Sequence, residues 1–411
     1  MHGYHKNFFE TNFLSFKMFG IWVPNNLSVV QRSLYDLYIV TLLAIAGLYF
    51  ISEIIVIKDT RKNLFDLLSN IGMLVTHVVG VSKFATMFLK REKIEGMMKK
   101  LQSDRFKYES VGDFKPCEIF NASKEVSSKH TWSLICVYGF VGISAHFSAL
   151  ISMRQASSQD YINCNDYVPY YGYVPFTLDT IGKCHFLFFF MDVPLVIFAL
   201  HIAAFDSLFG AISNCLKCQL LIVSEAFTSI RIRVLTKLKL PETFQTFRDE
   251  EHPKLEQAMY DEMKHCTQHL ETLISVHQDI EEMFTYVILA QSLVSLVVYA
   301  TGLYVGSYIP LMSPEFFPRM LYFLAILMQF ATYCWYGSEI IYAGSNVGPS
   351  IFNCDWTSAS QRFKKAMILN IIRMRYGLYF SIGKFTPLTV ATLIAVLRGS
   401  FSYFAVFKSM E

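Results

Sequence analysis

Charged residues are scarce in this chain of 411 residues: Asp, Glu, Lys and Arg make up 17% of it, whereas 53% is hydrophobic. A soluble protein of this composition would expose large apolar patches and aggregate. A disulfide framework is lacking too, because only nine cysteines occur, scattered between residues 117 and 354. The composition therefore excludes a soluble globular protein and predicts a polytopic membrane protein.

Sequence motifs of catalysis and nucleotide binding are also missing. There is no Gly-rich phosphate loop, no Gly-x-Ser-x-Gly and no His-Glu-x-x-His. His265 and His269 share a helix face beside Cys266, but no further ligand follows at a spacing that completes a metal site. A polar position at a helix contact is the favoured interpretation. We expect no enzyme activity, no metal and no cofactor.

Seven apolar runs of about 20 residues are long enough to cross a bilayer as helices. The sequence thus predicts an all-α membrane protein with seven transmembrane helices. Residues 1–33 lack an apolar core followed by small residues, so we expect no cleavable signal peptide. The predicted spans are Leu34–Ile57, Leu68–Leu89, Thr131–Ser152, Cys184–Phe209, Met283–Tyr308, Met320–Ala343 and Phe385–Phe407.

Basic residues are distributed unevenly between the segments that connect these spans. With a cytoplasmic N-terminus, the inner segments hold 27 Lys and Arg and the outer segments hold 7. The positive-inside rule then predicts a cytoplasmic N-terminus and an extracellular C-terminus. The net charge of +3 reflects these loops, and we expect no nucleic-acid partner. The glycosylation sequons at Asn26 and Asn121 agree, because both would remain unmodified inside.

The long outer loop 153–183 is rich in tyrosine. It could fold over a cavity mouth as a lid, or its rings could form an interfacial belt. Cys164 and Cys184 both fall on the outer side, where a bridge between them is compatible with the oxidising exterior. The tyrosines are Tyr161, Tyr167, Tyr170, Tyr171 and Tyr173.

Two inner stretches have the spacing of amphipathic helices. Residues 208–282 are mostly helix-forming with one break near 240–253, and residues 358–378 oppose apolar and basic faces. We expect these helices to pack into a cytoplasmic anchor layer below the membrane. A helix lying on the membrane surface is the alternative for the second stretch.

The final span carries the charged Arg398 partway along it and has one face of small or polar residues. Such a stripe suits a helix that lines a water-filled path, and small residues also suit close helix–helix packing. The spacing alone favours packing. The stripe consists of Ala395, Gly399, Ser402, Val406 and Ser409.

The outer halves of the second, third, fourth and sixth spans are rich in aromatic residues, Met and His. Apolar walls with a few polar groups suit a small, mostly neutral ligand, while ordinary helix packing is the alternative for each residue. The intramembrane carboxylates Asp192, Asp206 and Glu339 are too scattered for an acid–base dyad, and we expect structural pairing for Asp192. The candidate ligand-binding residues are Met73, His77, His146, Leu150, Phe186, Phe190, Tyr322, Phe323 and Ile326.

Four motifs resemble those of the insect odorant receptor family, and the resemblance spans nearly all of the chain. Cys266–Ser275 is similar to the family's cytoplasmic helix motif, and Tyr333–Glu339 is similar to its sixth-span signature. Val347–Trp356 resembles the loop that follows this span, and Phe385–Phe407 resembles the final span, including Ser402-Tyr403-Phe404.

The resemblance implies a ligand-gated, nonselective cation channel in which four subunits surround one pore. The last span would line this pore, with Ser402 along it, Val406 and Met410 at a hydrophobic gate, and Ser409 beside the ion path. The co-receptor of the family typically has Gln where Ser409 stands. The chain also lacks the co-receptor's extended inner loop, which implies an odour-tuning subunit. The implied partners are a small volatile odorant, the co-receptor in a heterotetramer, membrane lipid and permeating cations, at the plasma membrane of olfactory sensory neurons.

The resemblance also implies a separate role for each of four segments of the chain. Residues 1–33 would form the cytoplasmic N-terminus, 34–209 the first four spans with the ligand pocket, 210–384 the anchor segments with spans five and six, and 385–411 the pore helix. A gustatory-type channel is the runner-up, although its usual Thr-Tyr…Gln-Phe ending is replaced here. A G-protein-coupled receptor would need an extracellular N-terminus, and its Asp-Arg-Tyr and Asn-Pro-x-x-Tyr motifs are absent.

Overall fold

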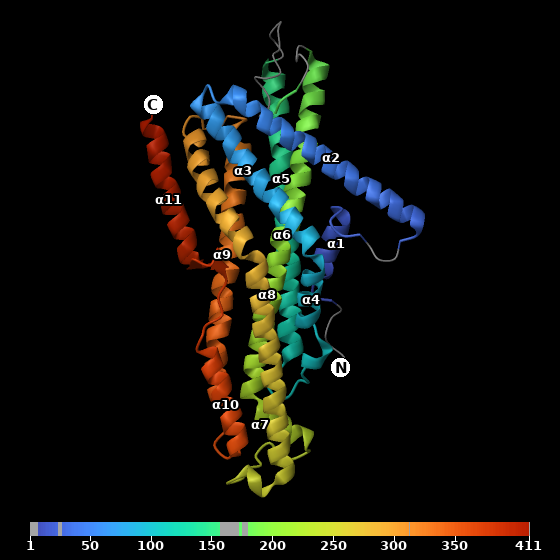
Figure 1. Ribbon diagram of the computed structural model, residues 1–411, viewed down its shortest axis with the longest axis vertical. Coiled ribbons are helices and arrows are strands. Elements are labelled where there is room, and N and C mark those ends of the chain that lie inside the picture. Colours follow the sequence, from blue (N-terminus) through green and yellow to red (C-terminus); the bar gives the residue numbers. More distant parts are fainter. Residues whose placement is uncertain (1–6, 24–26, 157–171, 175–179, 312, 411) are drawn as a thin grey trace.

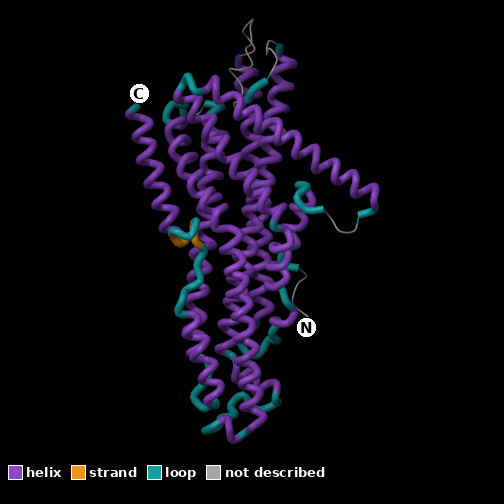
Figure 2. The backbone as a smooth tube through the Cα atoms, viewed as in Figure 1, coloured by secondary structure: helices purple, strands orange, loops and turns teal. Residues whose placement is uncertain are grey.

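The protein is a bundle of long helices arranged nearly parallel to one axis (Figures 1 and 2). The computed structural model describes residues 7–23, 27–156, 172–174, 180–311 and 313–410. The helices are α1 (Glu10–Met18), α2 (Val29–Thr60), α3 (Leu64–Leu89), α4 (Arg91–Leu101), α5 (Pro116–Ala156), α6 (Ile181–Thr228), α7 (Ile230–Lys237), α8 (Pro253–Gly306), α9 (Phe316–Phe352), α10 (Gln361–Met374) and α11 (Val390–Ser409). Two short 3-10 turns (Asp104–Phe106 and Asp249–Glu251) and two short strands, β1 (Ser381–Ile382) and β2 (Thr386–Pro387), complete the described structure.

Seven of these helices are long and apolar enough to cross a membrane, as predicted. They are α2, α3, α5, α6, α8, α9 and α11. Four of them, α5, α6, α8 and α9, extend well beyond the predicted spans. Their amphipathic continuations contain few helix-breaking residues, so the helical hydrogen bonding runs on past the apolar stretch.

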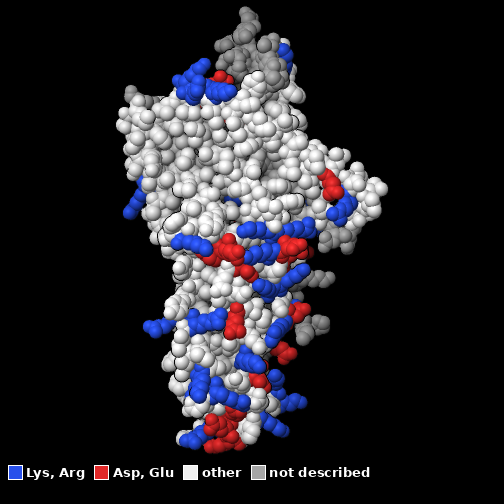
Figure 3. Space-filling model, viewed as in Figure 1, with Lys and Arg blue, Asp and Glu red and all other residues white. Residues whose placement is uncertain are grey.

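Charged side chains divide the visible surface into two parts (Figure 3). The upper part shows few charged side chains below a small charged cap, and because it holds the apolar spans we call it the apolar half. The lower part, which holds α7, α10 and the start of α8, is covered with charges of both signs, and we call it the charged half. The C-terminus lies at the far end of the apolar half. An apolar belt between charged ends is the surface that a bilayer requires.

The predicted anchor helices form the core of the charged half. The long helical structure is interrupted between the end of α7 at Lys237 and the start of α8 at Pro253, close to the predicted break near 240–253. Helix α10 falls within residues 358–378, as predicted. Helix α10 packs against α8 and α9 rather than lying apart from the bundle. Phe363 and Met367 are buried there, and Asn370 donates a 2.7 Å hydrogen bond to Thr267 of α8. These contacts confirm helix packing for this segment over the surface-helix alternative.

The start of the last span was predicted wrongly. It was expected at Phe385, but α11 begins at Val390, because residues 381–387 form a hairpin in which Ser381 faces Pro387 and Ile382 faces Thr386. Positive φ angles at Gly383 and Lys384 turn the chain back on itself. The hairpin is fixed to α8, since Gly383 donates its amide to the Thr285 carbonyl at 3.1 Å.

Gly337 of α9 lies directly against the end of this hairpin. A Cβ added at this position would clash with the carbonyl oxygen of Leu388. This oxygen belongs to the backbone, so it cannot rotate away as a side chain could. We expect Gly337→Ala to lower the free energy of unfolding by about 1–3 kcal/mol through overpacking. Thermal unfolding in detergent measures the loss. Gly139→Ala is the matched control, because nothing lies within 4 Å of a Cβ there. Equal stability of the two variants would contradict the close approach.

Candidate functional site

The nine predicted ligand-binding residues separate into two neighbouring groups in the apolar half. His77, His146, Leu150 and Phe190 lie on or beside a buried cluster formed by α2, α5 and α6. Tyr322, Phe323 and Ile326 lie in a second cluster with residues of α8 and α11. The last two members fit neither group closely: Met73 is half-buried, and Phe186 is exposed and stacks on Phe190 with 6.5 Å between ring centroids.

His77 forms a buried pair with a residue that sequence reasoning missed. Its Nδ1 lies 2.7 Å from Oε2 of Glu53, and both side chains are almost fully buried. The His77 ring also lies 4.5 Å from the Phe198 ring and 5.8 Å from the Tyr49 ring. A glutamate inside an apolar run was the available signal, because ionisable residues in spans are rare and generally paired.

His146 of α5 pairs with Asp192 of α6. This contact confirms the structural pairing that was expected for Asp192. The His146 ring lies 6.5 Å from the Phe188 ring, so the pair borders the same buried cluster as His77. Glu339 is paired as well, with Lys217.

The second group is organised around hydroxyl groups. The Tyr322 hydroxyl lies 2.7 Å from the Thr76 hydroxyl and donates to the Gly72 carbonyl at 3.2 Å. The Tyr299 hydroxyl donates to the carbonyl of Ile326 at 3.1 Å. These bonds tie α3, α8 and α9 together beside the apolar side chains of Phe323 and Ile326.

Part of the tyrosine-rich loop covers the first cluster. The Tyr173 amide donates to the Ser52 carbonyl of α2 at 3.3 Å, and Gly172 approaches Met191 and Tyr49 closely. Cys184 is disulfide-bonded. Its expected partner Cys164 and the other four tyrosines of the loop lie outside the described residues. The described piece of the loop has the position that a lid would take.

A buried charge pair lies deeper in the bundle. Lys83 Nζ is 2.6 Å from Oδ1 of Asp206, and the two side chains are 1% and 3% exposed. Asp206 also accepts hydrogen bonds from Tyr333 at 2.6 Å, Gln329 at 2.5 Å and Tyr138 at 3.3 Å. This cluster, which we call the Asp206 hub, joins α3, α5, α6 and α9. The scattered distribution of carboxylates in the sequence gave no sign of it.

A narrow slot lies beside the hub. It is too narrow to hold a water molecule. Gln291 donates to Gln329 at 2.9 Å on its wall. None of the nine predicted ligand residues lines this slot, which is bordered by Thr76, Val79, Lys83, Ile202, Gln291, Val294 and Gln329.

Helix α11 presents its small and polar stripe to the outside of the chain. Ser402, Val406, Ser409 and Met410 are all exposed. The opposite side packs mainly on α8, through residues that include Leu397 and the buried Ser400. Gly399 of the stripe approaches α8, where an added Cβ would lie 3.0 Å from Leu296. Ser402, Val406 and Ser409 are left free to face water or another subunit.

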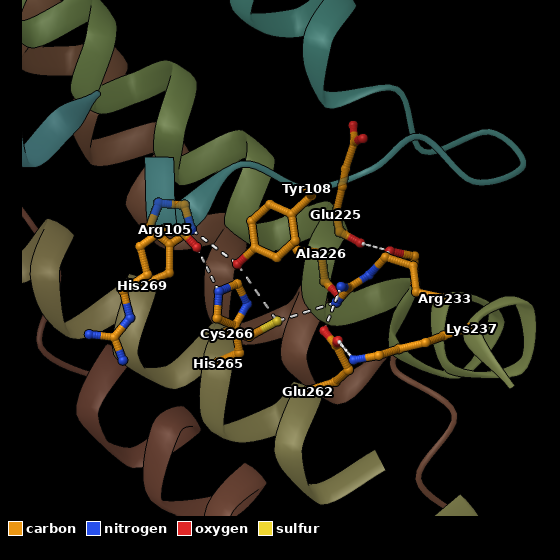
Figure 4. A network of polar contacts seen from close by, with 11 residues as sticks. Arg105, Tyr108, Glu225, Ala226, Arg233, Lys237, Glu262, His265, Cys266 and His269 are labelled. Atoms are coloured by element: carbon orange, nitrogen blue, oxygen red, sulfur yellow. Dashed lines mark hydrogen bonds and ion pairs between the residues drawn. The ribbon is translucent and has the colours of Figure 1, made fainter. Parts of the chain in front are cut away.

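The histidines of the possible metal motif take part in a helix contact of the charged half (Figure 4). His265 Nε2 lies 2.9 Å from the Arg105 carbonyl oxygen, and His269 Nδ1 lies 3.1 Å from the Tyr108 hydroxyl. Cys266 accepts a contact from Arg233 at 3.4 Å. Burial raises the pKa of the Tyr108 phenol well above its usual value, so the hydroxyl stays protonated. These side chains fasten the loop before α5 and helix α7 to α8.

Comparisons with known proteins point to one family. The family model described as "7tm Odorant receptor" matches residues 63–401. Odorant receptor Or1 of Anopheles gambiae is 19% identical over 98% of this chain and 95% of the relative. Putative odorant receptor 92a of Drosophila melanogaster is 29% identical over 22% of each chain. Among solved structures, the olfactory receptor OR5 of Machilis hrabei in complex with eugenol has a TM-score of 0.78 at 10% identity, covering 98% of both chains.

Proposed function

This chain belongs to the insect odorant receptor family, and from this premise we propose that it is the odour-tuning subunit of an odorant-gated, nonselective cation channel. In this proposal a small volatile binds in the apolar half, and a pore opens between this chain and co-receptor subunits in a heterotetramer. The charged half would lie in the cytosol with the N-terminus, and the C-terminus would be extracellular. The site of action would be the plasma membrane of olfactory sensory neurons.

One observation carries the channel proposal: the last helix exposes its polar face instead of burying it. Ser402 and Ser409 are exposed, and so is the charged Arg398 in the middle of the helix. A helix surrounded by lipid would not present these groups, because polar and charged side chains are expensive in hydrocarbon. A water-filled path between subunits satisfies them, and it explains why packing within the chain uses the opposite face.

The gate would lie near the end of the same helix. Val406 on the stripe and Met410 just after the end of the helix are both exposed, and apolar side chains at a constriction block ions by keeping it dry. Ser402 would lie along the pore, and Ser409 would stand beside the ion path. Ligand binding opens the channel only as far as the ligand prefers the open arrangement, which sets its efficacy.

The ligand pocket would form where the two groups of candidate residues meet. His77 and Thr76 are adjacent on α3, and Thr76 contacts Tyr322 of the second group. Met73, His146, Leu150, Phe186, Phe190, Phe323 and Ile326 remain candidates around this junction. The loop at Tyr173 would act as a lid above them.

The deciding experiment is whole-cell current recording with a broad odour panel that includes eugenol. The chain is expressed alone and together with a co-receptor subunit, with G-protein signalling blocked. We expect rapid cation current only in the pair. Current from the chain alone would show a self-sufficient channel, and responses that vanish under G-protein blockade would contradict the channel proposal.

A further inference from the structure

Four titratable side chains from four different helices surround one buried apolar cluster. Glu53 of α2 is paired with His77 of α3, and Asp192 of α6 is paired with His146 of α5. The described part of the outer loop covers the same cluster, through Gly172. The buried members of the cluster are Ala46, Tyr49, Ala149, Met153, Cys184, Leu187, Phe188, Met191, Ile197 and Phe198. We call this arrangement the four-acid–base chamber, or simply the chamber.

Both carboxylates stand on the cluster-facing sides of their helices. On α2, Glu53 follows Tyr49 by four residues, and on α6, Asp192 follows Phe188 by four residues, so each acid continues a buried stripe. Tyr49 and Phe188 are fully buried members of the cluster. The two acids therefore lie beside the same buried apolar cluster, on two different helices.

Each carboxylate keeps one oxygen that has no hydrogen-bond partner among the described residues. These atoms are Oε1 of Glu53 and Oδ1 of Asp192. Glu53 is fully buried and Asp192 is 9% exposed, so bulk water does not satisfy them. Buried acceptors without a donor are costly, and native proteins rarely leave them so without a reason. A ligand that donates hydrogen bonds would remove this cost.

The negative charge of the two acids favours a cationic donor over a neutral one. A hydrogen bond from an ammonium group to a carboxylate oxygen is stronger than one from a neutral donor, because both partners are ionised. Lys83 does not offset this charge, because its ammonium is committed to Asp206. The rings of Tyr49, Phe188 and Phe198 supply aromatic surface of the kind that attracts ammonium groups.

We propose that the chamber binds a small volatile amine in its protonated form. The ammonium group donates hydrogen bonds to the free oxygen of Glu53 or Asp192, and the hydrocarbon tail packs among the apolar side chains. This inference rests on the proposed odorant-gated channel and names the class of its ligand. It also replaces the expectation of a mostly neutral ligand with that of an apolar amine.

The test uses cells that express the chain with a co-receptor subunit and three probes of similar length: hexylamine, 1-hexanol and N-hexylacetamide. Hydrogen bonds to charged groups correspond to about a tenfold to hundredfold gain in affinity. We therefore expect hexylamine to activate at a concentration lower by that factor than either neutral probe. This comparison needs no variant and is independent of mutant folding.

Variants then test whether Glu53 and Asp192 cause the preference for hexylamine. Glu53→Gln and Asp192→Asn keep the side-chain shape but remove the charge, and at least one of them should raise the hexylamine EC50 by about tenfold to a hundredfold. Surface labelling shows whether each variant is folded, and Glu53→Asp should recover part of the response. Glu315→Gln removes an exposed acid at the start of α9 and should leave the amine response unchanged.

The outcomes separate the inference from the proposed function. Current evoked by neutral volatiles without an advantage for hexylamine would overturn the amine inference and leave the channel intact. An amine advantage that survives both charge-removing substitutions would overturn the assignment to these residues. Silence toward every volatile class, with both subunits at the surface, would contradict the channel proposal itself.

Discussion

Replacing Asp206 with alanine is expected to lower the free energy of unfolding by about 3–5 kcal/mol, since it leaves the Lys83 ammonium buried without a counter-charge. Lys83 is 1% exposed, and its ion pair with Asp206 is 2.6 Å long. The substitution also removes the acceptor for Tyr333, Gln329 and Tyr138. Thermal unfolding in detergent and the amount of protein at the cell surface measure the loss.

Two further variants make this expectation specific. Replacing both partners by apolar residues, as in Lys83→Met with Asp206→Leu, should restore much of the stability, because no charge is then left unpaired. Glu282→Gln breaks an ion pair with Lys93 in which Glu282 is 71% exposed. It should have no measurable effect, as is usual for surface pairs. An Asp206→Ala protein as stable as the Glu282→Gln protein would argue against an essential hub.

Replacing Val406 with serine is expected to raise the current that flows without ligand several-fold. Val406 is exposed on the stripe of α11, and in the proposed channel it keeps the constriction dry. A hydroxyl group favours water at that position, and a wetted constriction conducts ions. Whole-cell current before odour application, divided by the amount of protein at the surface, measures the change.

The controls address side-chain chemistry and position. Val406→Leu keeps the surface apolar and should keep the resting current low. Phe401→Ser introduces the same hydroxyl at an exposed position about a third of a turn away from the middle of the stripe, and should not increase the resting current. If Val406→Ser leaves both resting and evoked currents unchanged, the gate lies elsewhere on the helix.

Composition and hydropathy were sufficient to predict the seven apolar helices and the helical extensions in the charged half. These features depend on apolar stretches and on helical periodicity, which are properties of the local sequence. The start of the last helix was wrong for a local reason as well: Phe385 and Leu388 extend the apolar run. The turn at Gly383 and Lys384 was the signal that a hairpin precedes the helix.

The polar pairs inside the bundle could not be predicted as pairs. Glu53 with His77 and Lys83 with Asp206 join different helices, and the rotation and depth of each helix decide which side chains meet. Those quantities follow from packing over the whole bundle rather than from local spacing. Sequence reasoning therefore found His77, His146 and Asp192 but missed Glu53, the partner of His77.

The hairpin at residues 381–387 gives α11 the properties of a lever. Its base is fixed: Ser381 donates its amide to Glu281 at 2.8 Å, and Gly383 binds the Thr285 carbonyl. Near its far end, Phe404 and Phe407 pack on a cluster that includes Tyr304, and Lys408 donates to the Tyr308 hydroxyl at 2.7 Å. A helix of 20 residues is about 30 Å long, so a tilt of about 10° around the base would carry the tip through about 5 Å. Small rearrangements next to the hairpin are thus magnified where Val406 and Met410 lie.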